Sequence, residues 1–276
     1  MLAKEKNCMD WLSRLFASLS IDSFGALSIG DAQIINARLL EKENFVPRSV
    51  LMFVIPYYAG ETVNLSRYAA ARDYHIFIKE ITDRLIAGIK AEYPEANAKG
   101  YGDHSPINER SAALRAGLGI LGDNGLLIHE KYGTYIFIGD VITDLSPELL
   151  FAKPAGAVHF CEHCGKCKAA CPTGILRGEG MDCLSAITQK KGELLESEKT
   201  LMRKYNTAWG CDICQTACPH NRKPEITPIA FFRESLIPHL TEEILSSMSK
   251  EDFSERAFAW RGRATVARNL EILEEK

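Results

Sequence analysis

The chain has 276 residues, of which 46% are hydrophobic and 25% are charged, and its formal net charge is −3. These values are ordinary for a soluble globular protein, and the length favours one large domain or two modest ones. They exclude a disordered tail, a collagen-like chain and a small protein held together only by disulfides. The mild acidity argues against a uniform nucleic-acid-binding surface.

The N-terminal segment has apolar residues at helical spacing, which predicts a first amphipathic helix packed on a core. These residues are Trp11, Leu12, Leu15, Phe16 and Leu19. Asp10 and Arg14 interrupt the stretch, so it lacks the unbroken apolar core of a signal peptide. No window approaches the roughly 18 apolar residues that a membrane span requires. We therefore expect a cytoplasmic protein without membrane contact, in which clustered cysteines bind metal rather than form disulfides.

The N-terminal half alternates strand-like and helix-like segments. An apolar run over residues 49–55, stopped by Pro56, is typical of a buried strand. Residues 66–93 carry an apolar stripe at helical spacing, and residues 134–145 form a second β-rich run. This alternation predicts an α/β or α+β domain over residues 1–150, with loops at strand ends that can hold a cofactor.

A glycine-rich loop lies between these segments. Gly117, Gly119 and Gly122 satisfy the G-x-G-x-x-G string of dinucleotide-binding proteins. That fingerprint requires a strand before the loop, whereas residues 109–115 have the pattern of a helix. The sequence therefore does not predict a nicotinamide site.

From residue 160 onward the character of the chain changes. Eight of the nine cysteines fall between Cys161 and Cys218, and the apolar periodicity weakens. Such a segment gains its stability from bound metal rather than from a large core. We expect a metal-binding domain over residues 151–224, followed by a short helical tail over residues 225–276.

The first group of cysteines has the spacing of a bacterial ferredoxin. It reads Cys161-x2-Cys164-x2-Cys167-x3-Cys171, and a proline follows. In this pattern three closely spaced thiolates bind one [4Fe–4S] cluster, and the fourth binds the other cluster of a two-cluster domain.

The second group repeats the pattern without its first cysteine. It reads Cys211-x2-Cys214-x3-Cys218, again with a proline after it, and Ala208 stands at the leading position. Cys183, alone between the two groups, is the obvious replacement for the missing ligand.

Together the cysteines supply four ligands to each of two clusters in a ferredoxin-like domain. One cluster is assigned Cys161, Cys164, Cys167 and Cys218. The other is assigned Cys171, Cys183, Cys211 and Cys214. Two zinc sites with four thiolates each are the alternative, but zinc explains neither the three closely spaced cysteines nor the prolines. Cys8 is interpreted as an inert thiol.

Four further stretches carry a resemblance to a known family. They are residues 66–75 (SRYAAARDYH), 102–110 (GDHSPINER), 116–124 (AGLGILGDN) and 210–221 (GCDICQTACPHN). Together with the cysteine spacing they resemble the signatures of the epoxyqueuosine reductases, cobalamin-dependent iron–sulfur enzymes of tRNA queuosine synthesis. The resemblance runs from about residue 66 to residue 221 and more faintly beyond.

The resemblance implies a cofactor and a set of site residues. The N-terminal domain would bind cobalamin with its lower base detached, and the clusters would deliver electrons singly to the cobalt. Asp103 would be the acid that protonates the substrate oxygen, although an aspartate before Pro106 is also a common turn cap. The residues expected to contact the cofactor are Arg67, His75, Asn124 and Leu127.

The chain also departs from the family pattern. Ile120 and Asp123 stand where the family has Trp and Lys, and Gly102 replaces a Val, which we expect to loosen the backbone beside Asp103. The chain resembles a short form without the family's C-terminal helical-repeat domain, which weakens the expectation of tRNA as a partner. Four arginines near the end form either a phosphate-facing patch or a solvated helix face: Arg256, Arg261, Arg263 and Arg268.

Three functions are compatible with these features. The leading hypothesis is reduction of epoxyqueuosine in tRNA by two [4Fe–4S] clusters and cobalamin, fed by an external low-potential electron donor. The second keeps the cofactors but reduces another small substrate, as the related reductive dehalogenases do. The third is a two-cluster electron-transfer protein without a corrinoid.

Overall fold

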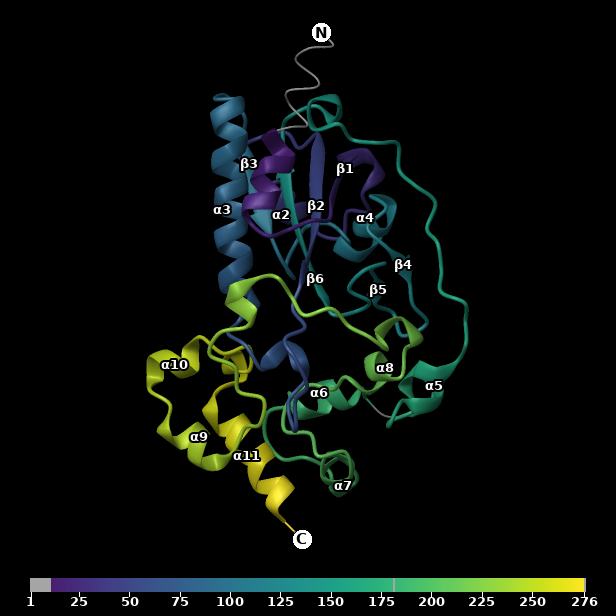
Figure 1. Ribbon diagram of the computed structural model, residues 1–276, viewed down its shortest axis with the longest axis vertical. Helices are drawn as coiled ribbons and strands as arrows, with labels where there is room; N and C mark the ends of the chain where they lie inside the picture. Colours follow the sequence, from purple (N-terminus) through teal and green to yellow (C-terminus); the bar gives the residue numbers. More distant parts are fainter. Residues whose placement is uncertain (1–10, 181, 276) are drawn as a thin grey trace. The chain divides into compact units, whose positions relative to one another are not determined.

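The computed structural model of the chain describes residues 11–180 and 182–275, and Figure 1 shows its ribbon. The chain divides into two compact units. The first contains the described residues up to Pro56 together with Phe77–Glu162, and the second contains Tyr57–Ile76 together with the described residues from His163 onward. Cys8, interpreted above as an inert thiol, lies outside the described residues.

The first unit is built on a four-stranded sheet in the order β1-β2-β6-β3, with antiparallel pairing throughout. Its strands are β1 Phe24–Ser28, β2 Ser49–Pro56, β3 Ala98–Tyr101 and β6 Ile136–Thr143. All eight residues of β2 are buried, as its unbroken apolar sequence predicts. Phe53 of β2 lies opposite Gly139 of β6, where an added Cβ would come within 2.6 Å of the Phe53 ring. The glycine therefore makes room for the ring.

Helices cover both faces of this sheet (Figure 1). On one face Phe16, in the helix over residues 11–18, stacks on Phe24 of β1 with ring centroids 4.1 Å apart. On the other face Ala112 and Ala113 share a core cluster with Met52 of β2. The helices and the small β4–β5 hairpin are α2 Ala37–Leu40, α3 Tyr74–Glu92 (in this unit from Phe77), α4 Glu109–Arg115, β4 Ile120–Leu121 and β5 Leu127–Ile128, with 3-10 turns at Ile29–Asp31 and Pro147–Leu150.

The predicted elements of this unit are largely confirmed, with one wrong boundary. The buried strand, the second β-rich run and the helix over residues 109–115 all form. The predicted helix over residues 66–93 instead begins at Tyr74, after a 3-10 turn at Arg67–Ala69. The earlier residues are held by distant backbone groups, since Ser66 N donates to Trp209 O over 2.7 Å. The mixed α/β character is as predicted, and the antiparallel pairing makes it α+β.

The second unit consists of short helices joined by irregular segments. They are α5 Lys166–Ala170, α6 Leu184–Thr188, α7 Glu196–Lys204, α8 Ile213–Thr216, α9 Glu242–Ser247, α10 Lys250–Ser254 and α11 Arg263–Glu274. The 3-10 turns are Arg67–Ala69, Ile175–Arg177, Pro219–Asn221, Ala230–Phe232 and Ala259–Arg261. Trp209 and Phe258 meet edge to face in its main core, with ring centroids 6.2 Å apart. The helical tail therefore packs in one core with the cysteine-bearing segment.

The segment Tyr57–Ile76 belongs to the second unit because of specific polar contacts. Asn64 is buried, its Nδ2 donates to Leu240 O over 2.7 Å, and its Oδ1 accepts from Leu240 N over 3.0 Å. Asn64 O also accepts from Ala208 N over 2.8 Å. The compact units thus differ from the sequence-based division at residues 150 and 224, which stays a prediction about domains.

None of the helices in the described part of the chain combines the length and the apolar character needed to cross a bilayer.

Candidate functional site

The two cysteine runs share one local plan. In each, a residue with positive φ (52° at His163, 74° at Gly210) lies directly before the first cysteine of a C-x2-C pair, and a short helix, α5 or α8, carries the second cysteine of that pair. The last cysteine of each run, Cys171 or Cys218, is buried and comes directly before a proline. None of the eight described cysteines forms a disulfide. The similar spacing in the sequence therefore corresponds to similar local structure.

The eight cysteines are not all in one unit. Cys161 belongs to the first unit, whose boundary follows Glu162, and the other seven belong to the second. Cys164 and Cys183 are exposed, whereas Cys211 is only partly so. The pKa of the Cys211 thiol is raised to about 12, mainly by burial and also by nearby Cys183 and Cys214. Cys183 therefore lies close enough to the second run to affect Cys211, and its role as a ligand stays a prediction.

Cys171 is surrounded by hydrogen-bond donors. Burial alone would raise the pKa of its thiol, but backbone N–H groups of Leu176 and Gly174, with the backbone and side chain of Thr173, lower it overall. The Thr173 hydroxyl lies 3.7 Å from the sulfur. Donors to a ligand sulfur stabilise its thiolate and are one of the ways in which a protein tunes a cluster's potential.

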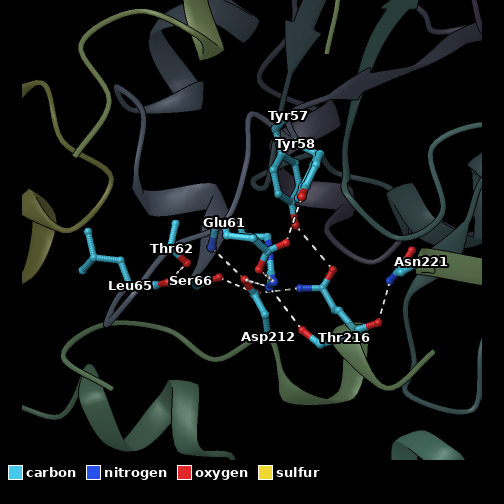
Figure 2. A network of polar contacts seen from close by, with 11 residues as sticks. Tyr57, Tyr58, Glu61, Thr62, Leu65, Ser66, Asp212, Thr216 and Asn221 are labelled. Atoms are coloured by element: carbon cyan, nitrogen blue, oxygen red, sulfur yellow. Dashed lines mark hydrogen bonds and ion pairs between the residues drawn. The ribbon is translucent and has the colours of Figure 1, made fainter. Parts of the chain in front are cut away.

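Asp212, between two cysteines of the second run, is the centre of a buried polar network (Figure 2). Its Oδ1 accepts from Ser66 Oγ over 2.5 Å and from Gln215 Nε2 over 2.9 Å. Its Oδ2 accepts from the backbone N of Arg67 over 2.7 Å and from Arg67 Nη1 over 3.2 Å. With these charge-assisted bonds, the carboxylate fastens the loop around the second run to residues 66 and 67.

Further hydrogen bonds extend this network from Arg67 and from Gln215 (Figure 2). Arg67 also pairs with Glu61 and donates to Thr216 Oγ1 over 3.2 Å. Tyr57 OH donates to Gln215 Oε1 over 3.4 Å, and Asn221 Nδ2 donates to Gln215 O over 2.8 Å. The loop from Cys211 to Asn221 is therefore held on several sides by side chains of the second unit.

Of the four residues expected to contact a cofactor, two lie in the second unit. Arg67 has only 10% of its side chain exposed, and its guanidinium bonds Asp212, Glu61 and Thr216. His75 is half exposed, its Nδ1 lies 2.7 Å from Asp73 Oδ1, and its ring stacks on Tyr74. Both side chains have structural partners, and their contact with a cofactor stays a prediction.

The other two lie beside the β4–β5 hairpin in the first unit. Asn124 Oδ1 accepts from Leu126 N over 3.3 Å, and its buried Nδ2 has no hydrogen-bond partner within the described residues. Leu127 is 3% exposed and packs in the core cluster that contains Ala112 and Ala113 of α4, and its contact with a cofactor stays a prediction. The glycine loop before them follows helix α4 and leads into β4, whereas the dinucleotide-binding fingerprint lies between a strand and a helix.

Asp103 lies on the loop between β3 and α4. It is exposed and adopts a left-handed conformation with φ of 64°, which is uncommon for a residue other than glycine. Its backbone N donates to Glu109 Oε1 over 3.0 Å. A non-glycine residue in this region is held there by its surroundings, and such positions cluster at functional sites.

The replacement of Val by Gly102 has a packing cause. A Cβ at this position would lie 2.7 Å from Cδ1 of Ile78 in α3. Gly102 therefore allows the loop to approach α3 closely. The expectation that it loosens the backbone beside Asp103 stays a prediction, and the structure adds a packing reason for the glycine.

The four arginines near the chain end have partners within the fold. Three of them donate to backbone carbonyls: Arg256 Nη1 to Ser235 O over 2.7 Å, Arg263 Nη2 to Met248 O over 2.9 Å, and Arg268 Nη1 to Gly192 O. Arg261 stacks on the Trp260 ring at 3.8 Å. All four side chains are partly exposed as well as bonded within the second unit, and both the phosphate-facing patch and the solvated face stay predictions.

Asp140, in the middle of β6, is a buried carboxyl residue that the sequence analysis did not single out. It is fully buried, accepts one hydrogen bond from Ser105 Oγ over 3.2 Å, and lies in the sequence FIGDVIT. A carboxylate inside an otherwise apolar strand is the signal that would have found it.

A profile described as "4Fe-4S double cluster binding domain" matches residues 160–221, the segment that contains both cysteine runs. Spacing, local structure and this match define an iron–sulfur protein with a binding domain for two [4Fe–4S] clusters. A second profile, described as "Epoxyqueuosine reductase QueG, DUF1730", matches residues 43–104.

Curated relatives named epoxyqueuosine reductase share much of this sequence. The protein of Cyclobacterium marinum is 33% identical over 223 residues, which cover 75% of this chain and 68% of that protein. The protein of Listeria monocytogenes is 34% identical over 212 residues, covering 73% of this chain and 54% of that one. The chain belongs to the epoxyqueuosine reductase family. It spans about half the length of several relatives, including those of Listeria monocytogenes and Bacillus subtilis.

Solved structures show the same fold. The epoxyqueuosine reductase of Streptococcus thermophilus superposes with a TM-score of 0.72 at 23% identity, covering 95% of this chain and 79% of that one. A crystal structure described as epoxyqueuosine reductase with a tRNA-Tyr epoxyqueuosine-modified stem loop has a TM-score of 0.76 at 23% identity, with 96% and 80% coverage.

Proposed function

We propose that this chain is an epoxyqueuosine reductase, which removes the epoxide oxygen of epoxyqueuosine in tRNA to give queuosine. The reaction consumes two electrons and two protons and releases the oxygen as water. The observation that carries the proposal is the double-cluster segment at residues 160–221 in a chain that is 33% identical to a named reductase over 68% of that relative's length. The neighbour determined with an epoxyqueuosine-modified stem loop supports the same class of substrate.

Cobalamin is part of the proposal. When bound, it supplies the electron-transfer centre at which the carbon–oxygen bond of the epoxide is reduced. The first unit fits such a ligand at Asn124, because a buried amide donor without a partner among the described residues is costly unless a ligand accepts from it. The corrin ring carries amide side chains with suitable acceptor oxygens. Arg67, His75 and the backbone at Leu127 are the further proposed contacts.

The protein itself contributes the cluster ligands and a general acid to this reaction. The eight cysteines hold the two clusters that receive electrons from an external low-potential donor. Asp103, on the loop before α4, gives a proton to the departing oxygen as a general acid. Its exposed position leaves the carboxyl accessible to a substrate and to solvent, which can return the proton. We place the reaction in the cytoplasm, with tRNA as the macromolecular partner.

The proposal is tested by restoring queuosine in a strain that lacks its own reductase. The wild-type chain should convert epoxyqueuosine to queuosine in total tRNA, measured by nucleoside mass spectrometry. Asp103→Asn should lower conversion about 100-fold or more while iron and cobalamin content stay unchanged. Asp83→Asn, an exposed carboxyl on α3, is the matched control and should convert as well as wild type. Absence of conversion by wild-type protein loaded with both cofactors would contradict the proposal.

A further inference from the structure

The first unit contains a buried carboxyl group, that of Asp140, which accepts a hydrogen bond from the loop that carries Asp103. Asp140 is in the middle of β6, opposite Met52 of β2 and Tyr101 of β3. Residues opposite one another in a sheet share a face, and Met52 and Tyr101 both belong to the apolar core under α4. Asp140 is 0% exposed. The carboxyl is therefore enclosed by apolar side chains.

Its hydrogen bonds are too few for an anion. Asp140 Oδ2 accepts from Ser105 Oγ over 3.2 Å, and Oδ1 has no partner among the described residues. A buried carboxylate normally accepts several bonds or pairs with a cation, because removing its charge from water costs several kcal/mol. A neutral carboxylic acid, which needs fewer partners, fits this site.

The neighbouring charges favour the same state. Burial raises the pKa of Asp140 well above its ordinary value of 3.8, and the negative charge of Glu109 raises it further, while the Ser105 hydroxyl lowers it. Tyr101 of β3 is the other titratable neighbour, and its hydroxyl donates to Glu43 Oε1 over 2.9 Å. Strand β2 has no titratable residue. Lys99 of β3 is exposed and lies opposite Ile142 rather than Asp140, and no positive charge is among the influences on the pKa of Asp140.

The hydrogen-bond partner of Asp140, Ser105, and its like-charged neighbour, Glu109, both belong to the segment that presents Asp103. Ser105 is two residues after Asp103, is 5% exposed, and also accepts from Ile107 N over 3.4 Å. Glu109, the first residue of α4, accepts the backbone N–H of Asp103 over 3.0 Å. The left-handed conformation of Asp103 is thus fixed between an anchor at Glu109 and an anchor at Ser105.

We propose that Asp140 is a positioning residue for the proposed acid: as a neutral carboxylic acid beneath the loop, it holds Ser105 and so keeps Asp103 in its presenting conformation. The inference rests on the proposed function for the role of Asp103, but the anchoring itself does not. Asp140 exchanges no proton with the substrate, so its amide analogue should replace it.

The first test is the pH dependence of stability in Asp140→Asn, with Asp83→Asn as the matched control. In the folded wild type Asp140 keeps a proton that the unfolded chain releases above about pH 4. Wild-type stability therefore falls as the pH rises from about 4 through the raised pKa, and the Asn variant lacks this contribution. We expect Asp140→Asn to melt about 2–4 °C above wild type at pH 8 and level with it near pH 4. Parallel pH profiles would overturn the proposal.

The second test is amide hydrogen exchange in Ser105→Ala, which removes the anchor from the side of the loop. Amides of residues 102–108 should exchange about 10-fold faster than in wild type, whereas those of β2 stay unchanged. Asp140→Asn keeps an acceptor and should protect these amides as wild type does. Unchanged exchange in Ser105→Ala, or lost protection in Asp140→Asn, would overturn the inference.

Turnover separates this inference from the proposed function. Asp140→Asn should retain wild-type conversion of epoxyqueuosine, with an unchanged pH profile of kcat, because the residue only positions Asp103. A loss of turnover in this variant with normal loop protection would show that Asp140 supplies a proton and would overturn the proposal. If wild type itself shows no conversion while the exchange results hold, the proposed function fails and the anchoring stands.

Discussion

Strand β2 and the first cysteine run show two different ways of specifying structure. All eight residues of β2 are buried, whereas only Cys171 is buried among residues 161–171. The strand is placed by apolar burial, which acts without any ligand. The cysteine run has little to bury, so its stability comes from the metal it binds and from polar contacts around it.

The polar contacts of the second unit come from a few buried side chains. Asp212 and Asn64 tie the segment before α3 to the second cysteine run and to Leu240. Asn269 of α11 donates to Thr188 O over 2.7 Å and to Ala208 O over 2.8 Å. Side chains of this kind fix the loops between short helices, where the first unit relies on its sheet. The contrast predicts that the two units respond differently to substitution.

The largest effect is expected from removing a cluster ligand. Cys183→Ser should lower the iron content from about eight to about four atoms per chain and remove one [4Fe–4S] signal, because one cluster loses its fourth thiolate. Iron analysis and EPR of anaerobically reconstituted protein measure this. Cys8→Ser is the control and should keep all of the iron. Full iron content in Cys183→Ser would disprove the assignment of this ligand.

A core truncation in the sheet should act on the first unit. Leu51→Ala in β2, at a position with 0% exposure, should lower the free energy of unfolding by about 2–5 kcal/mol, through lost burial and a new cavity. Urea unfolding followed by circular dichroism measures it, and Val46→Ala at an exposed position should change stability by less than about 0.5 kcal/mol. Iron content should be unchanged under native conditions. Loss of iron without a lower free energy of unfolding would contradict this difference between the two units.

A change in the polar network around Asp212 should affect mainly the cluster assigned to Cys171, Cys183, Cys211 and Cys214. Asp212→Asn puts an NH2 group where an oxygen accepts from Arg67, so a buried donor loses its acceptor at a cost of about 1–3 kcal/mol. This cluster should then lose iron to a chelator faster than in wild type, and the stability of the first unit should not change. Glu61→Gln, at a side chain that is 71% exposed, is the control and should behave as wild type. Equal rates of iron loss in Asp212→Asn and wild type would contradict the role of the network.

The smallest effect concerns pH and the first unit. Burial lowers the pKa of His129, against the opposing charges of Asp22 and Glu130, and its Nδ1 accepts from the backbone N of Lys131 over 3.2 Å. The folded state therefore holds a neutral ring, and its stabilising contribution is lost as the pH falls below about 6.5, where the unfolded histidine gains a proton. His129→Asn should flatten the stability curve between about pH 6.5 and 5.

Melting temperatures across that range measure the histidine effect. The exposed His239 offers the same substitution as a control and should leave the curve of the wild type unchanged. A His129→Asn curve that runs parallel to wild type would show that the buried ring does not govern the acid sensitivity of the first unit.

Much of the fold follows from local patterns in the sequence. Strand β2 and helix α4 form where apolar runs and helical spacing predict them, because their own residues decide the outcome. The start of α3 was predicted too early, because Ser66 is held by Trp209, a partner far away in the sequence. The sheet order also depends on β3, a short strand with the weak pattern AKGY. Long-range partners are what single-sequence patterns do not contain.

The residues of the candidate site also differ in whether local sequence or distant partners determine their role. The cysteines of the two runs are predicted by spacing, since a cluster imposes its geometry on the sequence, and Cys183 is predicted as the cysteine that remains between them. Asp103 was predicted only from the family resemblance, and nothing in its local sequence indicates a left-handed backbone held by Glu109. Asp140 was missed because its meaning depends on burial between β2 and β3, which only the structure gives. The packing reason for Gly102 was not predicted, because Ile78, which the glycine allows the loop to approach, lies on another element.

The central claim is that the chain passes electrons from two [4Fe–4S] clusters to a bound cobalamin. EPR of anaerobically reconstituted protein with added cob(II)alamin, before and after dithionite, tests it most directly. Our account predicts a cobalt signal typical of detached lower base, together with signals of reduced [4Fe–4S] clusters. Cluster signals accompanied by cobalamin that behaves as it does free in buffer would contradict the account and indicate an electron-transfer protein instead.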